Sequence, residues 1–195
     1  MQKKNKTYRL VLLGMLTAII IIQTSVPLLG YIPIGPLSLT IIQITVIIAA
    51  IVLGPIDGAI IGGVWGIITF IRAFTSPTSL LAPIIFTNPL ISVLPRIMIG
   101  VVAGLLFYKV LRNRMNDTTA MSVAGVLGSI TNTILVLGFV YLFVREPYAN
   151  AIDVNVEDLL PAILAIVGTN GVPEAILSGI ITPIIAKPLL KLRRK

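Results

Sequence analysis

Long apolar runs dominate the chain, and short segments rich in proline, glycine and polar residues separate them. The runs are continuous rather than alternating, which favours membrane-spanning helices over the strands of a barrel. Six spans fit the pattern best, at about residues 8–29, 39–53, 56–74, 90–111, 119–144 and 159–190. We therefore predict an all-α, polytopic membrane protein whose residues 1–195 form a single six-helix transmembrane domain.

The composition supports this class and removes several chemistries. The chain is 56% hydrophobic and 11% charged, with a mean hydropathy of +1.04, whereas a soluble domain carries about a quarter charged residues. It contains neither histidine nor cysteine, so the commonest general base, disulfides and thiolate metal sites are excluded. It also lacks a G-x-x-x-x-G-K-[ST] phosphate loop. We expect neither an enzyme nor a metal site.

The basic residues indicate the topology. They gather before the first span, between the fourth and fifth spans, and after the sixth, and an even number of spans places all three groups on one side of the membrane. By the positive-inside rule that side is the cytoplasm, so both termini are predicted to be cytoplasmic. The groups are Lys3, Lys4, Lys6 and Arg9; Lys109, Arg112 and Arg114; and Lys187, Lys191, Arg193, Arg194 and Lys195.

Small residues recur at helical spacing in two spans. Gly14 and Ala18 are four apart in the first span, and Gly58, Gly62 and Gly66 follow the same spacing in the third. Rows of this kind let helix backbones approach closely in a bilayer. They predict either packing within the bundle or a contact surface for another membrane protein.

Two ionisable residues interrupt the apolar runs. Arg96 could reach water from the outer end of the fourth span, or it could bind a carboxylate through two parallel hydrogen bonds. Glu174 lies deeper, four residues after Asn170, and it could pair with Arg96 or Arg72. Gly171 and Pro173 predict that the sixth helix is kinked or locally unwound there, as at many transporter sites.

Asn132, near the middle of the fifth span, is at a depth where it could face the same cavity. We therefore predict one outward-facing polar cavity for a small ligand with a carboxylate and hydroxyl or amide groups. Its candidate residues are Arg96, Asn132, Asn170 and Glu174. Aromatic residues make up only 6% of the chain, which disfavours a flat ring ligand. Two alternatives stay open: a stand-alone secondary transporter of a small carboxylate that uses Glu174 for proton coupling, and a scaffold without a ligand.

The stretch NPLISVLPRIMIGVVAGLLF, residues 88–107, resembles the substrate-binding subunits (S components) of energy-coupling factor (ECF) transporters. The resemblance covers nearly the whole chain. It implies a subunit that captures a vitamin outside the cell membrane of a prokaryote. A transmembrane coupling subunit (T component) and two ATPase subunits would then drive uptake. No cofactor is expected in this chain, because the partner ATPases use the ATP.

Among these subunits the chain is most similar to the pantothenate type. The resemblance implies that Arg96 takes the carboxylate of pantothenate, and that Asn132, Asn170 and Glu174 take its hydroxyl or amide groups. The family has an alanine-x-x-x-alanine row in its first span, where this chain has Gly14 and Ala18, and these would meet the coupling subunit. Residues 30–38 and 75–89 correspond to the loops that cover the site.

Overall fold

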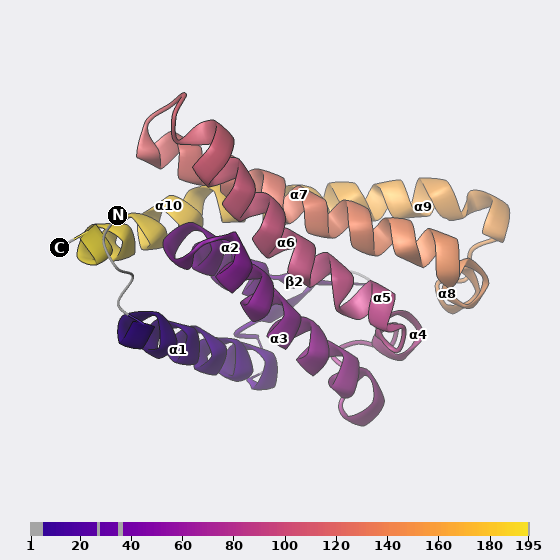
Figure 1. Cartoon of the computed structure of the whole chain (residues 1–195). Coiled ribbons are helices and arrows are strands. Elements are labelled where there is room, and N and C mark those ends of the chain that lie inside the picture. Colours follow the sequence, from indigo (N-terminus) through magenta and orange to yellow (C-terminus); the bar gives the residue numbers. More distant parts are fainter. Residues whose placement is uncertain (1–5, 27, 35–36, 195) are drawn as a thin grey trace.

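The chain folds into a bundle of helices with one small β-hairpin (Figure 1). The computed structural model describes residues 6–26, 28–34 and 37–194; Lys3, Lys4 and Lys195 of the basic groups lie outside these ranges. The elements, in order, are α1 (Lys6–Ser25), β1 (Tyr31–Ile34), β2 (Leu37–Thr40), α2 (Ile42–Leu53), α3 (Pro55–Thr75), α4 (Ala82–Phe86), α5 (Pro89–Ser92), α6 (Leu94–Leu105), η1 (Leu106–Leu111), α7 (Asp117–Phe143), α8 (Arg145–Ala151), η2 (Val156–Asp158), α9 (Leu159–Ile166), η3 (Val167–Gly171) and α10 (Val172–Arg194).

Five of the described helical segments are long and apolar enough to cross a membrane. They match five of the six predicted spans within a few residues, so the polytopic all-α class is confirmed. The fourth and sixth spans are composite, because short helices join end to end within them. The segments are Lys6–Ser25, Pro55–Thr75, Pro89–Leu111, Asp117–Phe143 and Val156–Leu192.

The second predicted span differs. Its first residues form strand β2, which pairs antiparallel with β1, and only Ile42–Leu53 is helical. Twelve residues are fewer than the roughly 20 that cross a bilayer, and every residue of α2 is buried by neighbouring helices. A helix enclosed by protein on all sides is apolar all round, so hydropathy alone could not separate it from a lipid-facing span.

The sixth span is not unwound at its glycine and proline. The backbone passes through a π-helical stretch, η3, and continues directly into α10, in which Pro173 follows the first residue. Proline has no backbone N–H, and it is tolerated at residue 173 because the wider π-helical turn before it does not require a hydrogen bond from that nitrogen. The predicted break is therefore a local widening of a continuous helix.

The glycine row of α3 packs against α6. A Cβ atom on Gly62 would lie 2.0 Å from the carbonyl oxygen of Arg96, and one on Gly66 would lie 2.7 Å from the Cα of Val93. From the other side, a Cβ on Gly100 would lie 2.2 Å from the backbone of Gly58. These close approaches confirm packing within the bundle for this row, and they fix the height of Arg96 relative to α3.

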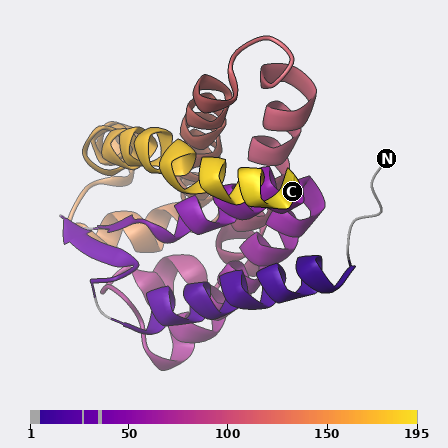
Figure 2. The same ribbon diagram turned by 90° about the vertical axis from the view of Figure 1, so that its left-hand side faces the viewer.

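Helix α1 runs along the edge of the bundle in both views (Figures 1 and 2). Its buried residues are Leu16, Ile20 and Thr24. Gly14 and Ala18 lie on the exposed part of the helix, and a Cβ on Gly14 would meet no atom within 4 Å. This row therefore does not serve packing within the described chain.

An ion pair ties α1 to the start of α3. Arg9 donates hydrogen bonds to both carboxylate oxygens of Asp57, whose side chain is 3% exposed, while that of Arg9 is 43% exposed. Asp57 also lies in the first turn of α3, where the helix dipole favours a negative charge.

We expect Arg9→Met to lower the melting temperature of the purified protein more than Asp57→Asn does. Loss of Arg9 leaves a buried carboxylate unpaired, whereas an Arg9 that loses its partner can turn to water. Differential scanning fluorimetry of the two variants in detergent measures the order. A larger loss of melting temperature in Asp57→Asn would contradict the conclusion that Asp57 depends on the ion pair more than Arg9 does.

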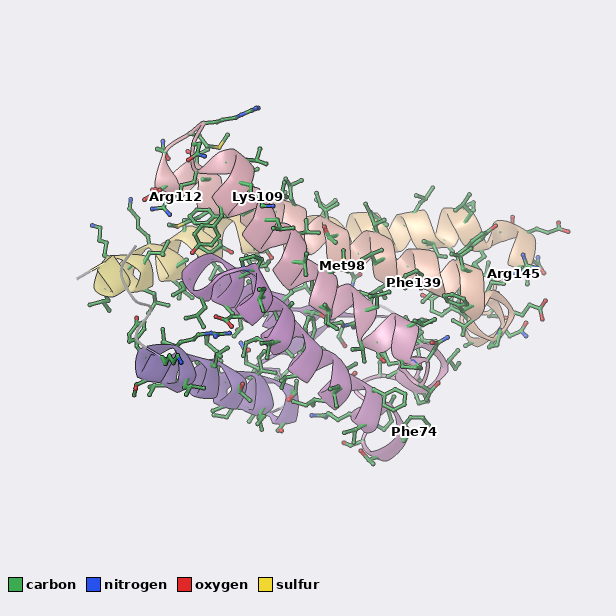
Figure 3. All side chains as sticks on the ribbon, in the orientation of Figure 1. Phe74, Met98, Lys109, Arg112, Phe139 and Arg145 are labelled. Atoms are coloured by element: carbon green, nitrogen blue, oxygen red, sulfur yellow. The ribbon has the colours of Figure 1, made fainter. Side chains whose placement is uncertain are left out.

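The described members of the three basic groups lie at one end of the bundle. The start of α1, the turn between η1 and α7, and the end of α10 lie together there (Figure 1). Lys109 and Arg112 are at this end, and Arg145, the first residue of α8, is at the opposite end (Figure 3). This arrangement agrees with the prediction from the sequence that the three basic groups lie on one side of the membrane.

Candidate functional site

A cavity opens between α6, α7, the η3–α10 segment and the β-hairpin. Its volume of about 70 Å³ exceeds the about 10–15 Å³ that a single water requires. All four residues predicted for the site line it. The lining consists of Tyr31, Ser38, Thr40, Thr78, Ser79, Phe86, Arg96, Asn132, Thr133, Val136, Leu137, Ile166, Asn170, Gly171 and Glu174.

Two connecting segments close the cavity. The β-hairpin contributes Tyr31, Ser38 and Thr40, and the segment after α3 contributes Thr78 and Ser79. Helix α4, in the same connection, adds Phe86. The cavity is thus bounded by helices on one side and by two short segments on the other, and these are the two loops that the family resemblance indicated.

Arg96 is held in a fixed orientation inside the bundle. Its side chain is buried, its Nη1 donates to the carbonyl oxygen of Ile91 at 2.8 Å, and its Nε has no partner among the described residues. The guanidinium carbon lies 5.0 Å from the ring centre of Trp65 and 4.8 Å from that of Phe86. Two aromatic rings therefore stabilise the cation, while the Nε donor of this cavity-lining residue stays unpaired.

A hydrogen-bond network joins α2, α7 and α10 beneath the cavity. Gln43 of α2 donates through Nε2 to Ser129 Oγ at 2.9 Å and to Glu174 Oε2 at 3.3 Å. Its Oε1 accepts from Asn132 Nδ2 at 3.3 Å, while Asn132 Oδ1 is buried and has no partner in the described structure. Polar groups buried at this depth are costly unless bonded, so an unpaired acceptor on a cavity-lining residue is a candidate ligand-binding group.

Glu174 fastens the hairpin to the bundle. Its Oε1 accepts from the backbone N–H of Thr40 at 2.6 Å, and its Oε2 accepts from Gln43. Among the residues that the structure describes, the ion pairs are Arg9–Asp57 and Arg112–Asp117, so Glu174 pairs with neither Arg96 nor Arg72. The ion-pair alternative for Glu174 is therefore wrong.

Asn170 lies in the π-helical stretch η3, where its Oδ1 accepts from Thr169 Oγ1 at 3.0 Å. The wider turn directs Asn170 and Gly171 to the cavity together with Glu174. A Cβ on Gly171 would lie 2.9 Å from Thr133 Cγ2, so this glycine keeps η3 close to α7 at the cavity wall. Functional sites often coincide with such π-helical insertions.

The arrangement suits a small anion that also carries donors. Arg96 supplies a cationic donor, and Asn132 supplies an acceptor. Val136, Leu137 and Ile166 form an apolar part of the wall. A pocket with a few convergent polar groups on an otherwise apolar wall is typical of a specific small-molecule site.

The family model for the substrate-specific component of ECF transporters matches residues 8–186 of this chain. The chain belongs to this family. A pantothenate transporter PanT from Leuconostoc mesenteroides is 38% identical over 183 residues, which cover 91% of this chain and 89% of that protein. A pantothenic acid transporter PanT from Lactococcus lactis subsp. cremoris is 35% identical over 170 residues, with 81% of each chain covered.

A solved structure shares the fold of this S component. The crystal structure at 2.1 Å of the S-component for biotin from an ECF-type ABC transporter superposes with a TM-score of 0.63 and covers 100% of this chain and 95% of that one. Sequence identity is 18%, so the likeness concerns the fold. It confirms that the helices of this S component form a membrane-protein bundle of the ECF type.

Sequence reasoning missed several residues around the cavity. Gln43 lies inside an apolar run, and a buried glutamine in such a run was the available signal. Trp65 is fully buried, and it lies against the guanidinium of Arg96 and donates to the hydroxyl of Tyr31 at 3.0 Å. No local pattern in the sequence indicated Thr40, whose backbone amide donates to Glu174.

We expect Glu174→Ala to release the hairpin of this S component. The substitution removes the acceptor of the Thr40 amide, so hydrogen exchange at residues 37–41 should accelerate by about tenfold or more, the loss of one charge-assisted hydrogen bond. Exchange mass spectrometry in detergent measures this. Asn88→Ala is the control, since Asn88 caps α5 outside the cavity lining. Equal exchange rates of the hairpin in the wild type and in both variants would show that the Glu174–Thr40 hydrogen bond does not hold the hairpin.

Proposed function

We propose that this S component captures pantothenate in the cavity lined by Arg96, Asn132, Asn170 and Glu174. The observation that carries the proposal is that the buried Arg96, which lies against two aromatic rings and has an unpartnered Nε, lines the same cavity as Asn132, whose Oδ1 is an unpartnered acceptor. Pantothenate has a carboxylate for the first and hydroxyl and amide donors for the second. The two PanT relatives, whose names state that they transport pantothenate, support the same ligand.

The proposed topology has six crossings and both termini in the cytoplasm. The buried helix α2 together with the hairpin would complete the second crossing inside the bundle. The position of the described members of the three basic groups at one end of the bundle supports this orientation by the positive-inside rule. The loops around Thr78 and Ser79 would then face outside, where the ligand enters.

Energy for uptake would come from partners, namely a T component and two ATPase subunits, as in the ECF transporters to whose family the chain belongs. The exposed row of Gly14 and Ala18 on α1 is the proposed contact for the T component, because it packs against nothing in the described chain. The alternative of a stand-alone proton-coupled transporter is not favoured by the family match, and Glu174 is already engaged by Thr40 and Gln43.

Uptake into proteoliposomes tests this division of labour. We expect radiolabelled pantothenate to accumulate only when the chain is reconstituted with a T component and ATPases and ATP is present. A Gly14→Leu/Ala18→Leu double variant should keep pantothenate binding but lose uptake. ATP-independent accumulation by the chain alone, abolished by a protonophore, would instead support the secondary transporter.

A further inference from the structure

We propose that Gln43 is a positioning residue that makes the site select for a hydrogen-bond donor on the ligand. It lies in α2 behind the cavity wall, is fully buried, and is absent from the residues that line the cavity. The inference rests on the proposed function, because it assigns how the pantothenate site chooses among groups of similar size and shape.

The carboxylate of Glu174 determines how the amide group of Gln43 is oriented. A carboxylate presents only acceptors, so the Gln43 group that faces it must be the NH₂ group. The two hydrogens of this NH₂ group are directed to Glu174 Oε2 and Ser129 Oγ, at 3.3 Å and 2.9 Å. The Gln43 amide is thereby fixed with its oxygen toward α7.

The fixed oxygen of Gln43 then orients Asn132. It accepts from Asn132 Nδ2 at 3.3 Å, so the NH₂ group of Asn132 is used on the side away from the cavity. Asn132 Oδ1 is left buried, without a partner, at a residue that lines the cavity. An asparagine free to rotate could offer either group at this position, whereas this one is held with its NH₂ group bonded to Gln43 and its oxygen unpaired.

The ligand must therefore satisfy two opposite requirements. It must accept from Arg96 Nε and donate to Asn132 Oδ1, since both atoms are buried and otherwise unpaired. A group that only accepts, placed at Asn132, would leave two acceptors facing each other. A site built around a fixed polar group rejects the analogue that lacks its partner far more strongly than an apolar pocket does.

Ligand analogues matched to this prediction test it. The probes are pantothenate and three close analogues in which a donor is replaced: each hydroxyl in turn by fluorine, and the amide N–H by an ester oxygen. For the wild-type protein we expect one of the three analogues to bind about tenfold or more weakly than pantothenate, the cost of a buried acceptor left unpaired. For Gln43→Leu, the dissociation constant of this analogue divided by that of pantothenate should fall to about threefold or less, because the amide of Asn132 can then rotate.

A merely structural role for Gln43 would lower the affinity for all four probes equally and leave the ratio unchanged, and that result would overturn the proposal. Equal binding of all four probes by the wild-type protein would overturn it too. Gln43→Met, which keeps the length of the side chain, is the second variant should Gln43→Leu not fold. Gln23→Leu is the matched control, because Gln23 accepts a hydrogen bond from Thr45 of helix α2 but lies outside the network of Gln43. In this variant the ratio of analogue to pantothenate dissociation constants should stay as in the wild type.

The outcomes also separate this inference from the proposed function. If the folded wild-type protein binds no pantothenate, the proposed function fails and this inference fails with it. If pantothenate binds and depends on Arg96, but the analogue ratio is insensitive to Gln43, only the inference about Gln43 is overturned.

Discussion

Replacing Arg96 by alanine weakens pantothenate binding by about a hundredfold or more. Truncation of a buried, charge-assisted contact costs about 2–5 kcal/mol, and each 1.4 kcal/mol corresponds to a factor of ten. The ligand carboxylate would enter a cavity whose lining, among the residues that the structure describes, then keeps the acidic Glu174 and has no cation. Isothermal titration of purified protein in detergent measures the loss.

Arg96→Lys should recover little of this affinity and remain at least about tenfold weaker than wild type. Lysine keeps the charge but lacks the planar group that lies between Trp65 and Phe86 while donating to Ile91. Arg72→Ala is the control, since Arg72 is half-buried, contacts the carbonyl oxygen of Ser76, and is not among the cavity lining. Equal losses in Arg72→Ala and Arg96→Ala, in folded protein, would contradict the assigned role of Arg96.

Gly62→Ala destabilises the protein by about 2 kcal/mol or more and weakens ligand binding as well. The new methyl group would lie 2.0 Å from the carbonyl oxygen of Arg96, and a backbone atom cannot turn aside as a side chain can. The helices α3 and α6 must therefore separate, which also moves Arg96 away from Trp65. Thermal unfolding and pantothenate titration of the same preparation measure both effects.

Gly63→Ala provides a control on the neighbouring residue of the same helix. Its methyl group would lie 3.6 Å from Cγ1 of Ile97, an ordinary van der Waals contact. Alanine also has a higher helix propensity than glycine, so stability should be unchanged or slightly higher. If Gly62→Ala and Gly63→Ala behaved alike, the close approach of α3 and α6 could not be the cause.

Hydropathy and charge predicted most of the bundle, because each lipid-facing helix must satisfy its own backbone and present about 20 apolar residues. The exception, α2, shows the limit of that argument. Its burial depends on neighbours that are distant in sequence, so its twelve helical residues read as part of a membrane span. The hairpin before it was predicted as a loop, because its two short strands pair with each other and contain no long apolar run.

The candidate site could be predicted to the extent that polar residues in apolar runs are rare. Arg96, Asn132, Asn170 and Glu174 come from three different spans, and they all line one cavity. Their partners could not be predicted. Tertiary packing decides which of several donors or cations meets the Glu174 carboxylate, and the donors are the Thr40 amide and Gln43 rather than an arginine.

Equilibrium binding of radiolabelled pantothenate to the detergent-purified chain measures whether Arg96 and its cavity hold this ligand. We expect saturable binding of one pantothenate per chain, displaced by unlabelled pantothenate and not by biotin or thiamine. Binding should be lost in Arg96→Ala protein that unfolds at the temperature of the wild type. A folded wild-type chain that retains no pantothenate, or an Arg96→Ala chain that retains it equally well, would contradict the account.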